Sequence, residues 1–552
     1  QAEDGIRDRD VTGVQTCALP IYRSVNESSS GSVRLAQKGL DWSALLISSL
    51  TSGAQTGNQG VIDLPDANRT KPNPEDNHQR YLLAKITKKI SGSQDVLLTL
   101  EEVSKRRKTN LYSARTSTIF DHQAKDQLKR QRISIDVATR KNIFGFEDES
   151  SIKFWLQQAQ VNQLSIEDRL IDRARDNNLS DNSVGINVNW VNYQDGKISR
   201  KWTYGFDIQQ SRITQAVNRS GDYNDVVKYF PDTHRNLTGL YTQLELDGRA
   251  YSLIPAIRFD RYQFKSSQTG YALPVVNLSD SAISPSISGI WKWRPLAKPY
   301  ISWSKGFRAP TQDQVNNGFS NLRHGYTSVG NQNLKSEKAN GLEVGVKGVS
   351  AQLRYTMSAY SNQYKDFIEQ QIVGGTATPN DPLIYQYINR SKAKIQGLDV
   401  RLETLLNPYW TLTSGWVYSR GRTTSSDGQK QAIDTIQPMR ASFGLSYQRN
   451  TLKVATQWLH TWAKRSGDVG TVTDTQTRLQ VPQFVAPSYS IVNLKAQWQA
   501  KKDLNISFGI NNLFDKKYWR WSDVRGLEAA SPVADAYTAP GRNISLALRY
   551  DL

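Results

Sequence analysis

The stretch VGINVNW at residues 184–190 decides the fold class, because apolar and polar side chains alternate strictly along it. The same alternation recurs as WTYGFDI at residues 202–208, LEVGVK at 342–347, LDVRLE at 398–403 and VNLKAQW at 492–498. Side chains two residues apart face the same side of a strand, so each stretch predicts a strand with one apolar and one wet neighbour. A β-sandwich and a membrane β-barrel both provide such surroundings.

The extent of the pattern favours the barrel. Alternation persists through nearly all of the 552 residues without a helical block or a clear linker, whereas sandwich domains have about 100 residues each. Connections also alternate in length: Asn407-Pro408 separates two strands tightly, but residues 421–438 and 463–487 are long and polar. Short turns at one rim and long loops at the other are typical of outer-membrane barrels. We find no apolar run of about 18 residues, so no transmembrane helix is expected.

Counting strands predicts the size of the barrel. About 21 candidate strands follow residue 32, and closed barrels of this class have even numbers, so a barrel of about 22 strands is expected. Residues 3–21 resemble translated sequencing-adaptor DNA. We therefore assign residues 1–21 to a non-native segment and residues 22–552 to a transmembrane β-barrel. The odd count predicts that the first strand is absent.

Charge and cysteine content narrow the function classes. The formal net charge is +19, which is compatible with nucleic-acid binding or with a barrel that faces water and anionic lipid headgroups. Lysine and arginine are scattered along the chain, which favours outer-membrane lipid as the partner and argues against nucleic acid. The single cysteine, Cys17, cannot form an internal disulfide.

A long polar segment between two alternating runs carries the candidate site. It opens with Phe307, Arg308, Ala309 and Pro310, closes with Asn331, Gln332, Asn333 and Leu334, and contains His324 and Tyr326 near its middle. In an extended segment residues 324 and 326 would face the same side. Imidazole and phenolate are both axial ligands of haem iron. His324 is the first choice and Tyr326 the second, and an exposed loop histidine without a ligand remains the alternative.

These motifs resemble the FRAP and NPNL motifs of TonB-dependent haem and haemoglobin receptors, with Gln332 at the position of the family's proline. The resemblance extends over RTKPNPED at residues 69–76, NLKSEK at 333–338 and NNLFDKKYWRWSDVRG at 511–526.

The resemblance implies an all-β, 22-stranded barrel in the outer membrane of a Gram-negative bacterium. It also implies haem, free or on haemoglobin, as the transported ligand, and the TonB–ExbB–ExbD complex as the energy source of the intact protein. The plug domain and TonB box of that family are expected to be missing from this chain. A siderophore or cobalamin receptor and a passive porin remain alternatives.

Other residues have two interpretations each. Arg308 could attract a haem propionate, or it could form an ion pair with Glu337 or Glu343, which we favour. Tyr518, Trp519 and Trp521 could contact haem or a haemoprotein, or could belong to the aromatic girdle at the membrane interface. The sequence contains no phosphate-binding glycine loop, GxSxG, HExxH or zinc-ligand spacing. We therefore expect no catalysis, no catalytic cofactor and no metal other than haem iron.

Overall fold

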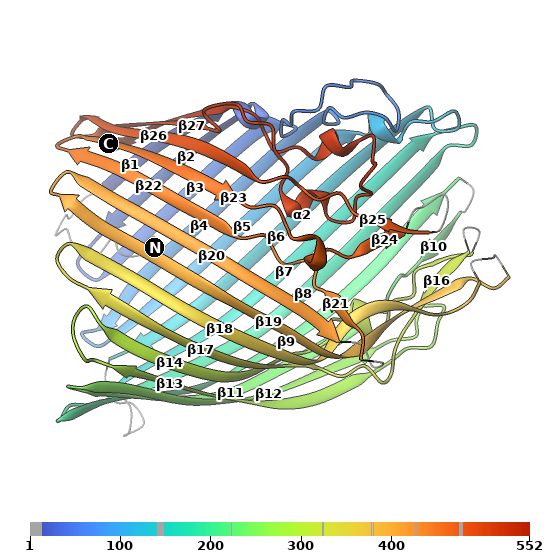
Figure 1. The fold of residues 1–552 in the computed structure, drawn as a ribbon. Helices are drawn as coiled ribbons and strands as arrows, with labels where there is room; N and C mark the ends of the chain where they lie inside the picture. Colours follow the sequence, from blue (N-terminus) through green and yellow to red (C-terminus); the bar gives the residue numbers. More distant parts are fainter. Residues whose placement is uncertain are drawn as a thin grey trace.

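The computed structural model describes residues 14–140, 148–221, 224–322, 325–376, 378, 380–424, 428–473 and 479–551. Within these residues, 22 antiparallel strands form one closed cylinder (Figure 1). The barrel strands are β1 (Val14–Arg23), β2 (Ser28–Lys38), β3 (Trp42–Ala54), β4 (Glu75–Ser91), β5 (Gln94–Asn110), β6 (Asp121–Thr139), β7 (Glu149–Asp168), β8 (Arg173–Gln194), β9 (Ile198–Ser220), β11 (Thr233–Gly248), β12 (Tyr251–Ser266), β13 (Leu278–Trp291), β14 (Lys298–Arg308), β17 (Glu337–Val349), β18 (Leu353–Gly374), β19 (Leu383–Asn407), β20 (Trp410–Thr424), β22 (Arg440–Arg449), β23 (Leu452–Thr461), β26 (Tyr489–Lys501), β27 (Leu504–Asn511) and β28 (Asn543–Asp551).

Short elements decorate one rim of the cylinder. The main sheet also includes β10 (Asp225–Val227), β15 (Ser320–Asn321), β16 (Tyr326–Val329) and β21 (Lys430–Ala432), and a separate hairpin pairs β24 (Thr471–Thr473) with β25 (Gln480–Pro482). The helical turns are α1 (Gln312–Val315), α2 (Trp521–Val524), η2 (Ser24–Asn26), η3 (Tyr112–Ala114), η5 (Ser466–Asp468) and η6 (Ala534–Tyr537). No helix in the described part of the chain is long and apolar enough to cross a membrane.

The barrel closes between its first and last strands. β1 pairs antiparallel with β2 on one side and with β28 on the other, from Cys17 opposite Asp551 to Arg23 opposite Ser545. The expected absence of a first strand is therefore wrong. β1 was not predicted as a strand because it lacks alternation between apolar and polar residues. Its register places Ala18 and Tyr22 on one face and Leu19 and Ile21 on the other, so neither face is polar throughout.

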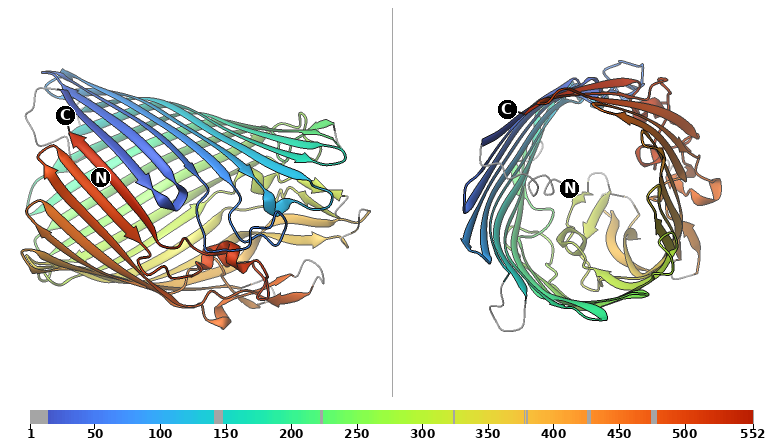
Figure 2. Two further views of the ribbon diagram at one scale, coloured as in Figure 1. Left: turned by 90° about the horizontal axis from the view of Figure 1, so that it is seen from above. Right: turned by 90° about the vertical axis from the view of Figure 1, so that its left-hand side faces the viewer.

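The alternation of the other strands separates an apolar outer face from a charged inner face, as predicted. Leu100, Ile133 and Leu156 are cross-strand neighbours that leave 46%, 39% and 46% of their surface exposed on the outer wall. Ion pairs line the inner wall, such as Arg130 with Glu101 at 2.9 Å and Arg258 with Asp207 at 2.9 Å. The view along the barrel axis shows the open cylinder that these strands enclose (Figure 2, right).

The two rims differ in the length of their connections, which confirms the predicted pattern. At one rim β4 and β5, and likewise β19 and β20, are joined by two residues each, at 92–93 and 408–409. Opposite, residues 309–336, 462–488 and 512–542 form long loops. Exposed aromatic side chains beside the short turns suit the membrane interface; they include Trp42, Trp202, Trp291, Trp293 and Trp410.

Candidate functional site

Residues 309–336, here called the 309–336 loop, connect β14 to β17 at the long-loop rim. The loop contains α1, β15 and β16, and β16 adds to β19 as a parallel neighbour, with Tyr326 opposite Leu383. In the axial view the yellow-green segment lies inside the outline of the barrel wall (Figure 2, right). The loop therefore stands over the mouth of the lumen.

An ion pair holds the base of the 309–336 loop. The Arg308 guanidinium donates to both carboxylate oxygens of Glu337, at 2.6 and 2.7 Å. Glu337 is buried and also accepts the Ile368 amide hydrogen at 2.8 Å. Of the two interpretations of Arg308, the structure shows the ion pair with Glu337, so its guanidinium joins the two ends of the loop.

The remaining motif residues form the floor of the loop. Phe307 stacks on Tyr262 with ring centroids 6.2 Å apart, Ala309 is half-buried, and Pro310 is fully buried. At the other end Leu334 is buried in a small core with Val315 and Ile368.

Asn331 shapes the turn before Leu334. Its side-chain amide donates to the Tyr387 carbonyl at 2.7 Å, and its side-chain oxygen accepts the Asn333 amide hydrogen at 2.9 Å. Gln332 is exposed within this turn, so no packing contact depends on a proline at that position. Both motifs thus anchor the loop.

Two further anchors were not identified from the sequence. Buried Asn316 exchanges hydrogen bonds with the backbone of Val276, accepting its N–H at 2.7 Å and donating to its carbonyl at 2.8 Å. The Tyr271 hydroxyl donates to the Asn316 carbonyl at 2.8 Å, and burial raises the pKa of Tyr271 to about 12. The Asn-Asn-Gly sequence that begins at Asn316 is a turn signal that could have indicated this anchor.

Tyr326 lies in an aromatic group at the edge of the loop. Its ring is 5.9 Å from Phe319 and 6.5 Å from Tyr385, and its hydroxyl accepts a hydrogen bond from the Asn321 side chain at 3.3 Å. Phe319 in turn meets Tyr229 edge to face at 4.8 Å. A half-buried phenol beside two other rings offers both a donor oxygen and apolar walls.

His324, the first-choice ligand, lies outside the described residues. The sequence argument assumed extended backbone through residue 325, and that premise is wrong. Gly325 has φ +71° and its amide donates to the Leu322 carbonyl at 2.9 Å, so the chain turns there. Alternation along a strand therefore does not place residues 324 and 326 on one side, and the pairing of the two ligands stays a prediction.

The aromatic residues of the last long loop lie in a second packed group. Tyr518 and Trp521 are buried, and half-buried Trp519 packs against Phe484 at 5.6 Å. The Trp521 indole N–H donates to the Asp434 carbonyl at 2.5 Å, so this side chain joins two loops. Because the rings of Tyr518 and Trp521 are covered, they present little surface to haem in this structure; contact with a haemoprotein stays a prediction.

A lysine covers the indole of Trp521. The Lys464 ammonium lies 4.4 Å from the ring centroid and donates to the Asp434 carbonyl at 3.1 Å. Burial lowers the pKa of Lys464. The cation–π contact and the shared carbonyl tie the 462–488 and 512–542 loops to the same short segment.

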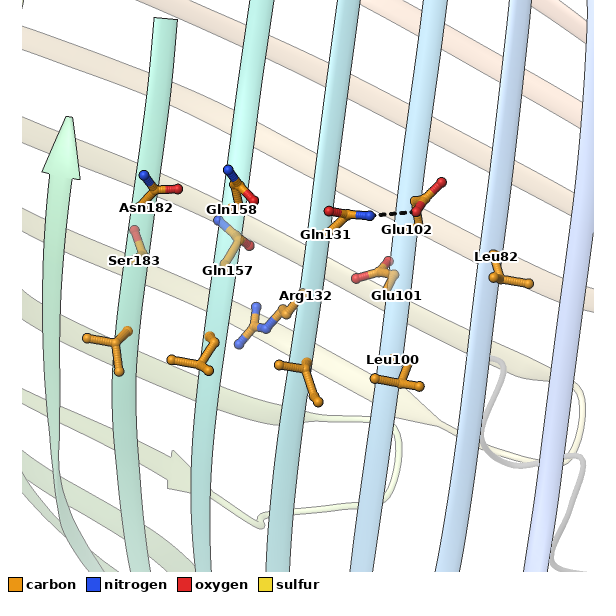
Figure 3. A pocket seen from close by; sticks show the side chains of 13 residues that line it. Leu82, Leu100, Glu101, Glu102, Gln131, Arg132, Gln157, Gln158, Asn182 and Ser183 are labelled. Carbon is orange, nitrogen blue, oxygen red and sulfur yellow. Dashed lines mark hydrogen bonds between the residues drawn. The ribbon is translucent and has the colours of Figure 1, made fainter. Parts of the chain in front are cut away.

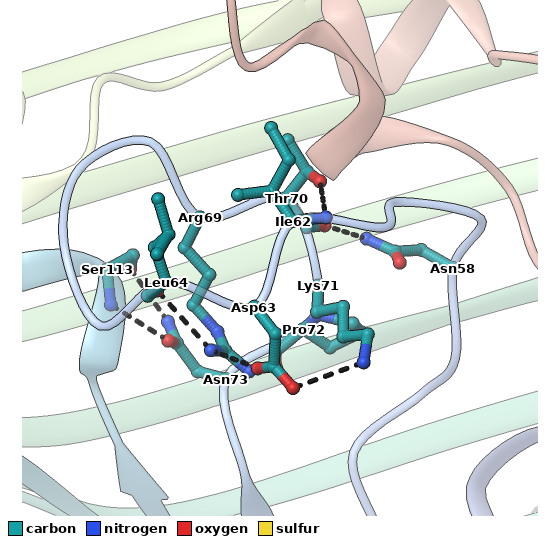
Figure 4. Close-up of polar contacts among 10 residues, drawn as sticks. All are labelled: Asn58, Ile62, Asp63, Leu64, Arg69, Thr70, Lys71, Pro72, Asn73 and Ser113. Carbon is teal, nitrogen blue, oxygen red and sulfur yellow. Dashed lines mark hydrogen bonds and ion pairs between the residues drawn. The ribbon is translucent and has the colours of Figure 1, made fainter.

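The RTKPNPED segment braces the loop of residues 55–74, which connects β3 to β4 (Figure 4). Buried Arg69 donates to Asp63 at 2.6 Å and to the Pro72 carbonyl at 3.0 Å. Hydrogen bonds from Lys71 and Arg69 hold the pKa of Asp63 below its usual value. Asn58 donates to the Thr70 carbonyl at 2.8 Å and to the Ala536 carbonyl at 2.9 Å, which links this loop to the 512–542 loop across the closing seam.

Comparison with known proteins agrees with this architecture. The sequence profile of the family described as TonB dependent receptor-like, beta-barrel matches residues 49–513. A stretch of 276 residues is 23% identical to the Probable hemoglobin and hemoglobin-haptoglobin-binding protein 4 of Haemophilus influenzae, covering 45% of this chain and 27% of that protein. A stretch of 291 residues is 24% identical to the Hemoglobin-haptoglobin utilization protein B of Neisseria meningitidis, covering 47% and 36%. The match thus spans about a third or less of the length of these relatives.

Solved structures share the fold at low sequence identity. The FrpB iron transporter from Neisseria meningitidis superposes with a TM-score of 0.75 at 14% identity, covering 100% of this chain and 83% of that one. The siderophore receptor PirA from Acinetobacter baumannii superposes with a TM-score of 0.74 at 14% identity, covering 99% and 81%. The family profile matches residues 49–513, and the chain forms a closed barrel with short turns at one rim and long loops at the other. The chain therefore belongs to the TonB-dependent receptor β-barrel family.

Proposed function

We propose that this chain forms the barrel of a Gram-negative outer-membrane receptor that captures haem, free or carried on haemoglobin, at its long-loop rim. The observation that carries the proposal is the 309–336 loop, which is anchored at both ends and carries Tyr326 on β16, beside β19 at the long-loop rim. The relatives named for haemoglobin binding and for haemoglobin-haptoglobin utilization support haem over other cargoes.

The chemistry of the loop suits a porphyrin. Haem needs an axial donor for iron and apolar walls for the macrocycle. The Tyr326 phenol can supply the donor, or His324 can, and the rings of Phe319 and Tyr385 lie beside Tyr326. Binding changes iron coordination and no covalent bond of the ligand, so the proposed activity is transport and not catalysis.

Uptake would follow capture. In the proposed cycle the intact receptor admits haem to the periplasm when the TonB–ExbB–ExbD complex rearranges its plug. The barrel supplies the wall of that passage, whose inner face carries charged side chains such as Arg130, Glu101 and Arg258. The membrane would surround the apolar outer face, with the short turns towards the periplasm.

A ligand-class experiment tests the proposal. Refolded chain in detergent is mixed with ferric haem, methaemoglobin, a ferric catecholate siderophore or cyanocobalamin. We expect haem to bind with a shifted Soret band and methaemoglobin to be retained by the immobilised chain. Binding of the siderophore or cyanocobalamin without any haem-dependent shift would overturn the proposal in favour of another cargo on the same barrel. Binding of none of the four would also overturn it and favour a passive barrel.

A further inference from the structure

Three polar side chains meet on the outer face of β3 and β4, near the long-loop rim. Ser52 and His78 are direct cross-strand partners, and Asp76 lies two residues from His78 on the same face of β4. The Ser52 hydroxyl oxygen lies 2.9 Å from His78 Nδ1, and His78 Nε2 lies 3.2 Å from an Asp76 carboxylate oxygen. The serine, the imidazole and the carboxylate therefore form one continuous hydrogen-bonded chain.

The two contacts of the imidazole fix its tautomer. An ionised carboxylate only accepts hydrogen bonds, so His78 Nε2 carries the proton that it donates to Asp76. Nδ1 then keeps its lone pair and accepts the hydrogen bond from Ser52. A serine that donates to a neutral imidazole, with a carboxylate on the other side of the ring, is the arrangement that activates serine as a nucleophile in hydrolases.

A second outward histidine shows what the carboxylate adds. His460 Nδ1 lies 2.8 Å from the Ser490 hydroxyl, which reproduces the contact between Ser52 and His78. Within the described part of the chain, however, no carboxylate contacts the ring of His460; its neighbours are indoles such as that of Trp462. The pair of Ser490 and His460 therefore lacks the third member and provides a matched control inside the same barrel.

The arrangement is open to a substrate. Ser52, His78 and Asp76 are all exposed, and a hollow of about 590 Å³ lies beside them, lined also by Leu50 and Arg80. Sites for small organic ligands have volumes of about 300–1,000 Å³. All of these side chains stand on paired strands of the barrel wall, which hold their geometry more precisely than loops would.

An apolar surface begins directly below the serine. Leu50 is the next outward residue of β3 towards the short-turn rim and is 61% exposed. Leu82 lies four residues from His78 on the same face of β4, and Figure 3 shows it beside the strand that carries Leu100 and, above it, Glu102. The site therefore has a polar part at the serine and an apolar part below it, which suits an ester with a hydrocarbon chain.

We propose that Ser52, His78 and Asp76 hydrolyse carboxylic esters that carry an apolar acyl chain, with the chain placed on Leu50. This activity would be a second one, on the outer wall, and is independent of the ligand that the 309–336 loop binds; haem transport itself needs no catalysis. Sequence motifs could not indicate the site, because Ser52 and His78 come together only through the pairing of two strands.

The reaction needs no reactant besides the ester and water. Ser52 Oγ attacks the ester carbonyl carbon while His78 Nδ1 takes its proton, and that proton then leaves with the alcohol as the ester C–O bond breaks. Water attacks the acyl-serine in the same way, so the carboxylic acid is released and Ser52 regains its proton. Asp76 is a positioning residue that holds the imidazole tautomer and stabilises the imidazolium.

Arg80 can stabilise the charge that develops on the carbonyl oxygen. It is the cross-strand partner of Leu50 and therefore diagonal to Ser52, within reach of a long side chain. Among the residues that the structure describes, the Arg80 guanidinium makes no hydrogen bond, and a Glu102 carboxylate oxygen lies 3.6 Å away. A cation whose donors are free can offset an oxyanion beside the serine.

The test measures covalent labelling and ester hydrolysis by the refolded full chain in detergent. An alkyl fluorophosphonate, which phosphonylates activated serines with loss of fluoride, is added to wild type, Ser52→Ala, His78→Gln and the control Ser490→Ala, and the modified residue is mapped by mass spectrometry. Hydrolysis of p-nitrophenyl octanoate is followed in parallel, with folding checked by heat-modifiable electrophoretic mobility.

We expect the fluorophosphonate on Ser52, and kcat/KM for the octanoate ester about 100-fold or more below wild type in Ser52→Ala and His78→Gln. Ser490→Ala should stay within about twofold of wild type, since general-base catalysis is untouched there. Absence of an adduct on Ser52, or equal hydrolysis by wild type and Ser52→Ala, would overturn the proposal. Ser52→Ala should bind haem as wild type does, so this test can fail without bearing on the proposed function.

Two further variants test the assigned roles. Asp76→Asn would donate to Nε2 and reverse the tautomer, so labelling should slow about 100-fold, whereas Asp76→Glu should retain more of it; equal labelling in both would overturn the role of the carboxylate. Wild type should prefer the octanoate to the acetate ester about tenfold or more, and Leu50→Asn should lose most of that preference. An unchanged preference would overturn the placement of the chain. Fatty-acid release from phosphatidylglycerol in mixed micelles would identify a lipid, rather than a water-soluble ester, as the source of the substrate.

Discussion

Arg308→Ala is expected to loosen the 309–336 loop while the barrel stays folded. Among the residues that the structure describes, the substitution leaves the buried Glu337 carboxylate with the Ile368 amide as its one remaining hydrogen-bond donor. Breaking a fully buried ion pair costs about 3–5 kcal/mol. Here the side chain of Arg308 is 51% exposed and that of Glu337 only 8%, so water can reach the vacated site. We therefore expect a smaller loss of local stability, about 1–3 kcal/mol.

Hydrogen exchange followed by mass spectrometry measures this loss. Peptides from the 309–336 loop should exchange about 5- to 150-fold faster in Arg308→Ala, as about 1.4 kcal/mol per tenfold implies. Arg401→Ala is the matched control, because Arg401 also donates twice to one carboxylate, Asp399, but is 77% exposed. Unchanged exchange in the loop, or equal acceleration in both variants, would refute the anchoring role of Arg308.

Three further substitutions test other parts of the structure. Trp521→Ala removes a buried ring and should destabilise the packing between the 462–488 and 512–542 loops by about 3–5 kcal/mol. Limited proteolysis of these loops should become faster while the heat-modifiable barrel stays intact. Protease resistance equal to that of wild type would contradict this expectation. Leu398→Lys places a charge on the lipid face of β19 and should lower the free energy of unfolding by about 2–4 kcal/mol near the midplane, measured by urea unfolding in liposomes. The control Thr356→Lys, on the inner face, should lower it far less. Subtracting the 295 nm titration of Tyr271→Phe from that of wild type should isolate a phenol with a midpoint near 12. Because the folded pKa is raised, the contribution of Tyr271 to stability is complete below pH 10 and falls as pH rises towards 12; a midpoint near 10 would show an exposed phenol.

The fold was predictable because its strands obey a simple physical rule. Strands between lipid and water need period-two alternation, and segments such as 184–190 and 398–403 carry it strongly. β1 was missed because Leu19 and Ile21 face the lumen side opposite Ala18 and Tyr22, so alternation is lost. Its place in the sheet is set by pairing with β2 and β28, which no local pattern reveals.

Part of the local structure around the candidate site was predictable. The motifs around Phe307 and Leu334 mark the two ends of one long loop, and the ion pair of Arg308 with Glu337 was anticipated, whereas the ligand role of this loop stays a prediction. The turn at Gly325 was not, because alternation was extrapolated through a glycine that adopts φ +71°. Trp521 is buried against Asp434, 87 positions away in the sequence, and Tyr518 packs against Tyr489 on β26. Sequence periodicity cannot show such contacts.

The most direct measurement is the Soret spectrum of ferric haem titrated into the refolded chain and into His324→Ala/Tyr326→Phe. The control His460→Ala/Tyr550→Phe removes the same two kinds of side chain from the barrel wall away from this loop. We expect a shifted Soret band with wild type and control, and at least tenfold weaker binding or no shift with the loop variant. An unchanged Soret shift in the loop variant would contradict the claim that the 309–336 loop supplies the iron ligand.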